Sequence, residues 1–328
     1  MDAFSTPSTL SENFYSHLST LLDVEYWSWM WWLFKPLMIT FLLPGLIYVL
    51  LYISIIVLYI YQFRHILREE AQHDFWNGAR TLLSLIWWCH ARIYYGYELC
   101  GLENIPSTGP ALIIYYHGAI PIDYYYMVAG IHMYKKRLMR GVGDRFLQSL
   151  PGFRLLLEVF KVTPGSVQSC VEVLRDGNIL GISPGGSFEA LFGTHKYQIL
   201  WRNRCGFAKV AQEAKVPIIP VFTQNIREAY RTFPYPMSFF LEVYERTRLP
   251  LVPIFGGFPV KLRTIIGKPI PYDGTLTTEQ VVEKTKVAVE DLIAEHQRIP
   301  GSIIKALAER FEWIPQLLGI RPKFTLKR

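Results

Sequence analysis

The 328-residue sequence has few charged residues, and its cysteines lack the spacing of a metal or disulfide framework. Only 19% of its residues are charged, whereas 51% are hydrophobic and the mean hydropathy is +0.18. This composition excludes a disordered protein and is unusual for a fully soluble one. No CxxC pair occurs, so reduced structural thiols are expected. The cysteines are Cys89, Cys100, Cys170 and Cys205.

Signals for nucleic-acid binding, metal binding and glycosylation are also missing. The net charge is +7, but the basic residues are scattered among acidic ones, and no zinc-finger, RRM or basic-helix pattern occurs. His90, His132 and His195 have no partner at metal-ligand spacing, so no metal is expected. An Asn-x-Ser/Thr acceptor is absent, which favours a cytosolic main domain. The basic excess suits an anionic partner, either a phosphorylated cofactor or an acidic leaflet.

One long run has no charge at all. The 28 residues from Pro36 to Phe63 contain no Asp, Glu, Lys, Arg or His, whereas a bilayer core needs about 20 helical residues. Pro44-Gly45 divides the run, so either one kinked helix or a hairpin turning near Gly45 fits, although Lys35 argues against a full first arm. Aromatic residues typical of a membrane boundary precede it. They are Tyr26, Trp27, Trp29, Trp31 and Trp32.

The charges around this run predict its orientation. Arg64, His65 and Arg68 follow it directly, whereas the residues before Lys35 include no Lys or Arg. The positive-inside rule therefore places the C-terminal body in the cytosol.

The rest of the chain alternates between strand-like and helix-like segments, which predicts an α/β domain. Residues 65–98 are expected to be helical but not to cross the membrane. Strands are expected at 111–116, 179–183, 216–222 and 260–266, and helices at 166–176, 207–214 and 279–296.

The first candidate motif is the segment from Tyr115 to Asp123, directly after an apolar strand. A histidine that leaves a strand beside a glycine can take a hydroxyl proton, and a nearby carboxylate can fix its tautomer. His117, Gly118 and Asp123 fit that pattern. The spacing alone fits a buried core histidine and a helix-capping aspartate equally well or better.

The second candidate motif, Ser183 to Leu191, follows another apolar strand. Gly185 and Gly186 allow close backbone approach to a ligand, and Glu189 suits the start of a helix. Ordinary turn chemistry also explains this motif. Two further motifs, Gly141 to Phe146 with Arg145 and Val216 to Val221, are weak alone, since a surface arginine and a buried strand between prolines explain them.

In this order and at these distances, the four motifs resemble the glycerolipid acyltransferase family, the lysophospholipid acyltransferase-like enzymes. The resemblance covers about residues 99–297 and implies a mixed sheet flanked by helices behind an N-terminal transmembrane anchor. The stretches beginning at His117, Ile182, Thr223 and Gly256 are most similar to the branch called transmembrane protein 68, which resembles type 2 diacylglycerol acyltransferases. The implied segments are a tail (1–25), an anchor (26–63), linking amphipathic helices (64–98), an acyltransferase domain (99–297) and a C-terminal segment (298–328).

The sequence departs from the phosphate-handling members of the family in two places. Five residues separate His117 from Asp123 where those members have four, which makes the dyad an inference. Gly185 and Phe188 stand where those members carry Glu and an Arg available for the acceptor phosphate. The Gly-Gly-x-x-Glu-Ala-Leu pattern instead looks like the neutral-glyceride branch.

The resemblance implies acyl transfer to mono- or diacylglycerol, forming triacylglycerol at the endoplasmic reticulum membrane. His117 would be the general base and Asp123 its orienter. The donor would be acyl-CoA as a co-substrate, with no bound cofactor, and Lys135, Lys136, Arg137 or Arg145 would meet its phosphates. Substrate contacts are expected from Gly118, Arg145, Pro184, Gly185, Gly186 and Glu189. The alternatives are acylation of lysophosphatidate or glycerol phosphate, and a non-catalytic lipid-binding protein of the same fold.

Overall fold

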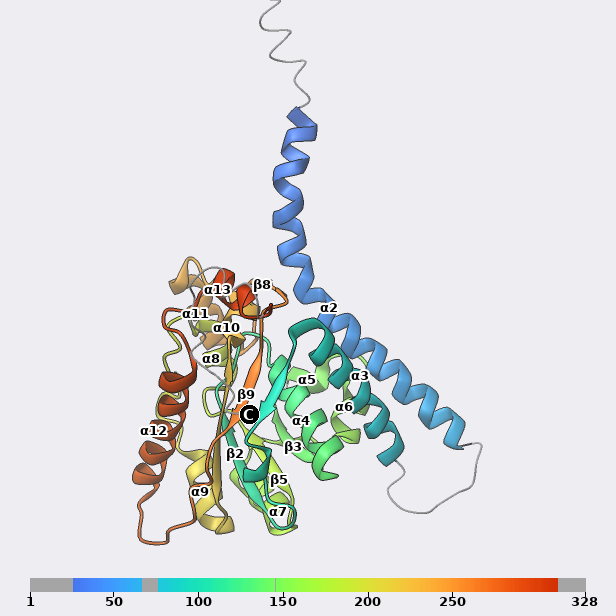
Figure 1. The fold of residues 1–328 in the computed structure, drawn as a ribbon. Coiled ribbons are helices and arrows are strands. Elements are labelled where there is room, and N and C mark those ends of the chain that lie inside the picture. Colours follow the sequence, from blue (N-terminus) through green and yellow to red (C-terminus); the bar gives the residue numbers. More distant parts are fainter. Residues whose placement is uncertain (1–25, 67–75, 145, 312–328) are drawn as a thin grey trace, which may run out of the picture.

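The structure, a computed structural model, describes residues 26–66, 76–144 and 146–311 (Figure 1). The helices are α2 (Tyr26–Ile66), α3 (Asn77–Tyr95), η1 (Leu102–Asn104), α4 (Ile122–Lys135), α5 (Phe146–Ser149), α6 (Phe153–Val159), α7 (Val167–Arg175), α8 (Gly186–Phe192), α9 (Gly206–Ala214), α10 (Ile226–Ala229), α11 (Met237–Thr247), α12 (Thr278–His296) and α13 (Ile303–Ala308). The strands are β1 (Glu98–Cys100), β2 (Ala111–Tyr115), β3 (Met139–Gly143), β4 (Thr163–Pro164), β5 (Ile179–Ile182), β6 (Ile218–Gln224), β7 (Tyr230–Thr232), β8 (Ile254–Gly256) and β9 (Arg263–Ile266).

Seven strands form the central sheet in the order β1-β9-β6-β2-β5-β3-β4. Only the β6–β9 pair is antiparallel, so the sheet is mixed and mostly parallel. Helices α9 and α12 lie on one side of it, and α3 and α4 lie on the other (Figure 1). The predicted α/β class, with a mixed sheet flanked by helices, is confirmed.

The sheet directs several loops toward one edge. All five residues of β2 are buried, as expected of an uninterrupted apolar run covered on both faces. Because β2 is parallel to β5 and β6, the segments that follow these three strands leave from the same edge. In open α/β sheets that edge is where ligands bind.

Helix α2 is one continuous helix from Tyr26 to Ile66, with Pro36 and Pro44 inside it. The hairpin alternative, with a turn near Gly45, is not what the structure shows. Over Ser28–Gln62 the helix is long and apolar enough to cross a membrane, and no other described helix is. Its first half stands clear of the body and its second half lies along it, as Figure 1 shows.

The second half of α2 belongs to the core. Ile47, Leu51, Ile55 and Leu58 are at most 4% exposed, and their spacing places them on one helix face. Residues of α3 and of the sheet join the same hydrophobic cluster. The core therefore extends beyond residues 99–297, and the proposed domain boundaries stay a prediction.

Candidate active site

His117 lies two residues beyond the buried end of β2, at the loop-bearing edge of the sheet. Its Nδ1 atom is 2.7 Å from the carbonyl oxygen of Gly118. A carbonyl only accepts, so Nδ1 carries the proton in the neutral ring and Nε2 keeps its lone pair. The pKa of His117 is lowered to about 4, mainly by burial; the hydrogen bond to the Gly118 carbonyl opposes this shift and the nearby Arg227 charge adds to it. At neutral pH the imidazole is therefore an uncharged base.

Glu189 fixes the position of the His117 loop through hydrogen bonds to the backbone. Its carboxylate accepts hydrogen bonds from the backbone N–H groups of His117 and Leu200, each at 2.9 Å, and the residue is fully buried. Burial raises the pKa of Glu189 to about 6, against the opposing effects of these hydrogen bonds and of Arg227. The side chain does not line the cavity described below. Its hydrogen bonds make Glu189 a structural brace of this loop, and the predicted substrate contact stays a prediction.

Arg227, in α10, also holds the His117 loop and was not predicted from the sequence. Its guanidinium is buried and donates to the His117 carbonyl at 2.8 Å, the Ala190 carbonyl at 2.9 Å and the Tyr116 hydroxyl at 3.1 Å, and also to the Glu189 carbonyl. It thus ties the loop after β2 to α8. Its only sequence signal was its place in the family-like stretch that begins at Thr223.

The structure does not join Asp123 to His117. Asp123 is in the first turn of α4 and is 3% exposed, and its Oδ1 atom has no hydrogen-bond partner among the described residues. Burial raises the pKa of Asp123 to about 6, and Thr223 opposes the shift. The Asp123 carboxylate hydrogen-bonds with Thr223, whereas the imidazole Nδ1–H of His117 donates to the Gly118 carbonyl. The expected contact is thus corrected, and a catalytic role for Asp123 stays a prediction.

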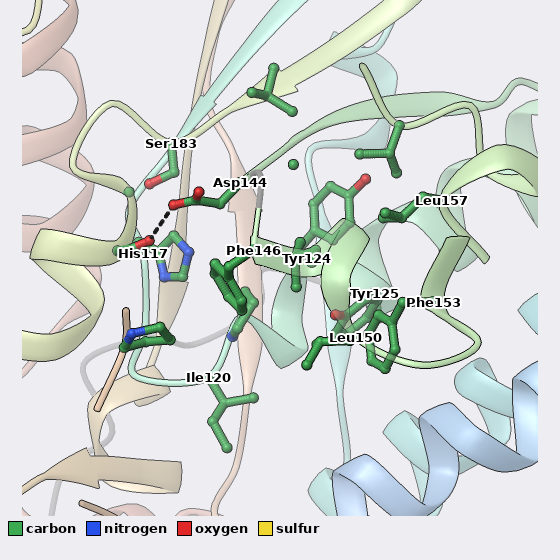
Figure 2. Close-up of a pocket in the computed structure, with 18 of the residues that line it drawn as sticks. His117, Ile120, Tyr124, Tyr125, Asp144, Phe146, Leu150, Phe153, Leu157 and Ser183 are labelled. Carbon is green, nitrogen blue, oxygen red and sulfur yellow. Dashed lines mark hydrogen bonds between the residues drawn. The ribbon is translucent and has the colours of Figure 1, made fainter. Parts of the chain in front are cut away.

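The imidazole faces a cavity of about 950 Å³, which is at the upper end of the range for small-molecule sites. His117, Asp144 and Ser183 lie together at one end, and Leu150, Phe153 and Leu157 lie at the other (Figure 2). Asp144 accepts a hydrogen bond from Ser187 at 3.1 Å. The apolar wall comes from α2, α4, α5 and α6. The cavity therefore combines one polar end with a long apolar interior.

The predicted glycine contacts divide into two groups. Gly186 lines the cavity, but its N–H donates to the Ser183 carbonyl at 3.1 Å and is not free for a substrate oxygen. Gly118, Pro184 and Gly185 do not line the cavity. An added Cβ would collide with Ile226 at Gly118 and with Glu189 at Gly185, so close packing requires both glycines.

The described basic residues that were predicted to meet the donor phosphates lie outside the cavity lining. Arg145 lies outside the described residues. Lys135, Lys136 and Arg137 do not line the cavity, and Arg137 donates to the carbonyls of Pro106 and Gly177 at 2.8 and 2.7 Å. Arg204, which the sequence analysis did not select, does line it. One of its nitrogens donates to the Pro184 and Gly185 carbonyls at 3.0 and 3.1 Å.

Comparison with known proteins yields matches to enzymes of lipid synthesis. Residues 97–224 match the family described as acyltransferase. The chain is 51% identical over 288 residues to a Homo sapiens protein named "DGAT1/2-independent enzyme synthesizing storage lipids", covering 88% of each chain. The Gallus gallus protein of that name is 47% identical over 291 residues, covering 88% of this chain and 87% of that protein.

A solved structure is also similar. It is the 1-acyl-sn-glycerophosphate (LPA) acyltransferase, PlsC, from Thermotoga maritima, with a TM-score of 0.49 and 14% identity, covering 74% of this chain and 95% of that one. The identities to the relatives, and the lengths over which they extend, settle the family: the chain belongs to the acyltransferases of glycerolipid synthesis, as its motifs suggested.

Proposed function

We propose that this chain transfers a fatty acyl group to the free hydroxyl of mono- or diacylglycerol and so forms triacylglycerol, with His117 as general base. The observation that carries the proposal is the unprotonated Nε2 of His117 at the polar end of a large apolar cavity. The relatives' name, which refers to the synthesis of storage lipids, supports it.

The reaction needs one proton to move twice. Nε2 accepts the proton of the acceptor hydroxyl as its oxygen bonds to the thioester carbonyl carbon of the donor, which we expect to be acyl-CoA. When the carbon–sulfur bond breaks, the imidazolium returns that proton to the leaving sulfur. The thioester carbonyl oxygen gains negative charge as the new bond forms, and a free backbone N–H at the polar end of the cavity would stabilise it. The Gly186 N–H is already engaged with the Ser183 carbonyl.

The polar end of the cavity favours an uncharged acceptor. The Asp144 carboxylate lines it close to His117 (Figure 2), where it would repel a phosphomonoester. A dianion in a partly buried site needs several cationic donors. In the described part of the chain, Arg204 is the one Lys or Arg that lines the cavity.

Arg204 nevertheless supports a second candidate, acylation of lysophosphatidate or glycerol phosphate. It is on the same cavity wall as Ser183 and Gly186, where an acceptor phosphate would bind. The two candidates therefore differ in whether Arg204 is needed for turnover.

A competition assay decides between them. Purified protein receives labelled oleoyl-CoA with equal diacylglycerol, monoacylglycerol and lysophosphatidate in one mixture. We expect the neutral glycerides to be preferred by more than tenfold in kcat/KM, at least about 1.4 kcal/mol in transition-state stabilisation. Arg204→Gln should leave that preference unchanged. If labelled phosphatidate is the main product and the Arg204→Gln variant no longer forms it, the second candidate is correct. If no labelled product forms, a non-catalytic protein is favoured.

We also propose that α2 anchors the chain in the endoplasmic reticulum membrane with the body in the cytosol. The apolar length of the helix and the basic residues that follow it, Arg64, His65 and Arg68, support this orientation. Protease treatment of sealed microsomes should digest the body without detergent. Protection of the region around Val260 would place it on the other side.

A further inference from the structure

A second apolar surface lies on the body, apart from α2. It is formed by α11 and the loops on either side of it, and each of its large hydrophobic side chains is at least 41% exposed. We call it the α11 surface; its members are Phe233, Tyr235, Met237, Phe239, Leu249 and Leu251. Phe233 and Tyr235 contact each other, with ring centroids 5.3 Å apart. A contiguous exposed apolar patch marks contact with a partner or a membrane.

The α11 surface is next to the place where α2 meets the body. Strand β8 follows it in the chain and packs on α2, with the rings of Phe41 and Phe255 6.0 Å apart. Gly257 is so close to Leu43 that an added Cβ would overlap it. Figure 1 shows α11 and β8 at the end of the body from which the free half of α2 departs.

The free half of α2 is too short to cross a bilayer alone. Residues from Ser28 to Leu42 stand almost wholly clear of the body, whereas a crossing needs about 20 helical residues. Counted from Ser28, about 20 residues end at Ile47, and counted from Pro36, where the charge-free run begins, they end at Ile55. In both cases Phe41 and Leu43, with the body packed against them, lie within the membrane crossing.

We propose that the α11 surface is a second membrane contact, which enters the leaflet that the second half of α2 occupies, with phospholipid as its occupant. The helix length requires some surface of the body beside Phe41 and Leu43 to enter the bilayer. The surface present there exposes the six apolar side chains named above, and the exposed charged residues of α11, Glu242, Glu245 and Arg246, lie in the C-terminal half of that helix. Both facts point to the same contact.

This contact bears on how lipid reaches the active site. Leu249, Leu251 and Ile254 line the cavity, and so do Ile47 and Leu51 of α2. A cavity wall that is also a membrane contact gives a bilayer-dissolved glyceride an entrance between α11 and α2. This last step rests on the proposed function, whereas the membrane contact itself does not.

Spin labels on the full-length protein in phosphatidylcholine vesicles test the contact. Nitroxides are attached to Met237→Cys or Phe239→Cys, with the exposed native Cys89 changed to serine and the same chain without a new cysteine as baseline. Val287→Cys on α12 is the matched control, because Met237 and Val287 are both 44% exposed. Power saturation with oxygen and with a water-soluble nickel chelate reports which medium surrounds each label.

We expect the α11 labels to be relaxed at least threefold more by oxygen than by nickel, and the Val287→Cys label to show the reverse. Strong relaxation by nickel at α11 would mean that water covers the surface and would overturn the proposal. Low accessibility to both reagents would mean that protein covers it, such as residues 312–328 or a second copy, and would overturn it equally. Neither readout needs turnover, so failure of the proposed function would be seen separately.

The entrance has its own test. Phe239→Asp, which is outside the cavity lining, should lower turnover of diacylglycerol in vesicles at least fivefold relative to turnover in detergent micelles. Val287→Asp should leave that ratio unchanged. An unchanged ratio for Phe239→Asp would overturn the entrance.

Discussion

The loop that carries His117 is held by directed hydrogen bonds, whereas the cavity that it faces is enclosed mainly by apolar side chains. In the loop, the N–H and carbonyl groups of His117 both pair with buried charged residues, Glu189 and Arg227. In the cavity wall, side chains from several helices meet without such pairing. Hydrogen bonds fix the position of a reacting nitrogen, while an apolar wall fixes only volume. Substitutions in the loop should therefore reduce activity or stability more than substitutions in the cavity wall.

Removal of the base should have the largest effect on turnover. His117→Ala should lower kcat by ~10²- to 10⁴-fold, the usual contribution of a general base, because no other described side chain replaces Nε2. The unfolding temperature should change little, since the loop is held through the backbone of residue 117. His195→Ala, outside the cavity lining, is the matched control. Measurable turnover within tenfold of the parent would assign the base elsewhere.

Loss of Arg227 tests the brace, by which we mean the hydrogen bonds of Glu189 and Arg227 to the His117 loop. Arg227→Met removes a hydrogen-bond donor from three carbonyls and a nearby positive charge from the buried Glu189 carboxylate, which should destabilise the fold by about 3–5 kcal/mol. Arg202→Gln is the control, because its pairing with Glu245 is exposed and should contribute at most about 1 kcal/mol. Thermal unfolding in detergent compares the two. Equal unfolding temperatures would show that Arg227 does not hold the loop.

These two predictions show how far the sequence alone could reach. The α/β fold and His117 were accessible because apolar runs between Pro or Gly residues indicate strands and because His-Gly follows one of them. The brace was not accessible, since Glu189 and Arg227 bond to a residue 72 and 110 positions away in the chain. Nor could a uniformly apolar run show that one face of α2, with Ile47 and Leu58, packs into the core.

The pH dependence tests the electrostatics of the braced loop. An ordinary histidine, with a pKa near 6.5, would be almost fully protonated at pH 5 and would lose roughly thirtyfold in activity. The pKa of His117 is about 4, so its active neutral form should persist to pH 5 and be lost only as the pH falls toward 4. We expect no fall in kcat/KM from His117 itself between pH 8 and 5, and at most a shallow change near pH 6 as the Glu189 carboxyl takes up a proton. A tenfold fall between pH 7 and pH 5.5 would contradict this electrostatic environment.

A substitution in the cavity wall should reduce turnover less than loss of the base. Leu157, at the apolar end of the cavity in Figure 2, becomes bulkier in Leu157→Trp and should exclude about two methylene groups of a bound chain. At about 0.8 kcal/mol per methylene, kcat/KM for long-chain substrates should fall about fifteenfold, with shorter chains unaffected. A series of donors and acceptors of graded length measures it. The matched control is Val287→Trp on α12, and equal losses for short and long chains would show that Leu157 does not limit chain length.

The smallest effect is expected for Asp123→Asn, which asks whether the loop needs this carboxylate. The imidazole tautomer is already fixed by the Gly118 carbonyl, so we expect kcat to fall less than about tenfold, against the far larger loss for His117→Ala.

The pKa of Asp123 is raised to about 6, which means that its charged form is less favourable in the fold than in the unfolded chain. Its contribution to stability is therefore greatest below its ordinary pKa of 3.8 and declines as the pH rises through 6. Asparagine cannot ionise, so unfolding temperatures of Asp123→Asn and the parent, compared at pH 5 and pH 7.5, should show the variant losing less stability over that interval. A loss of turnover as large as that of His117→Ala, with an unchanged unfolding temperature, would instead restore Asp123 as the partner that orients the base.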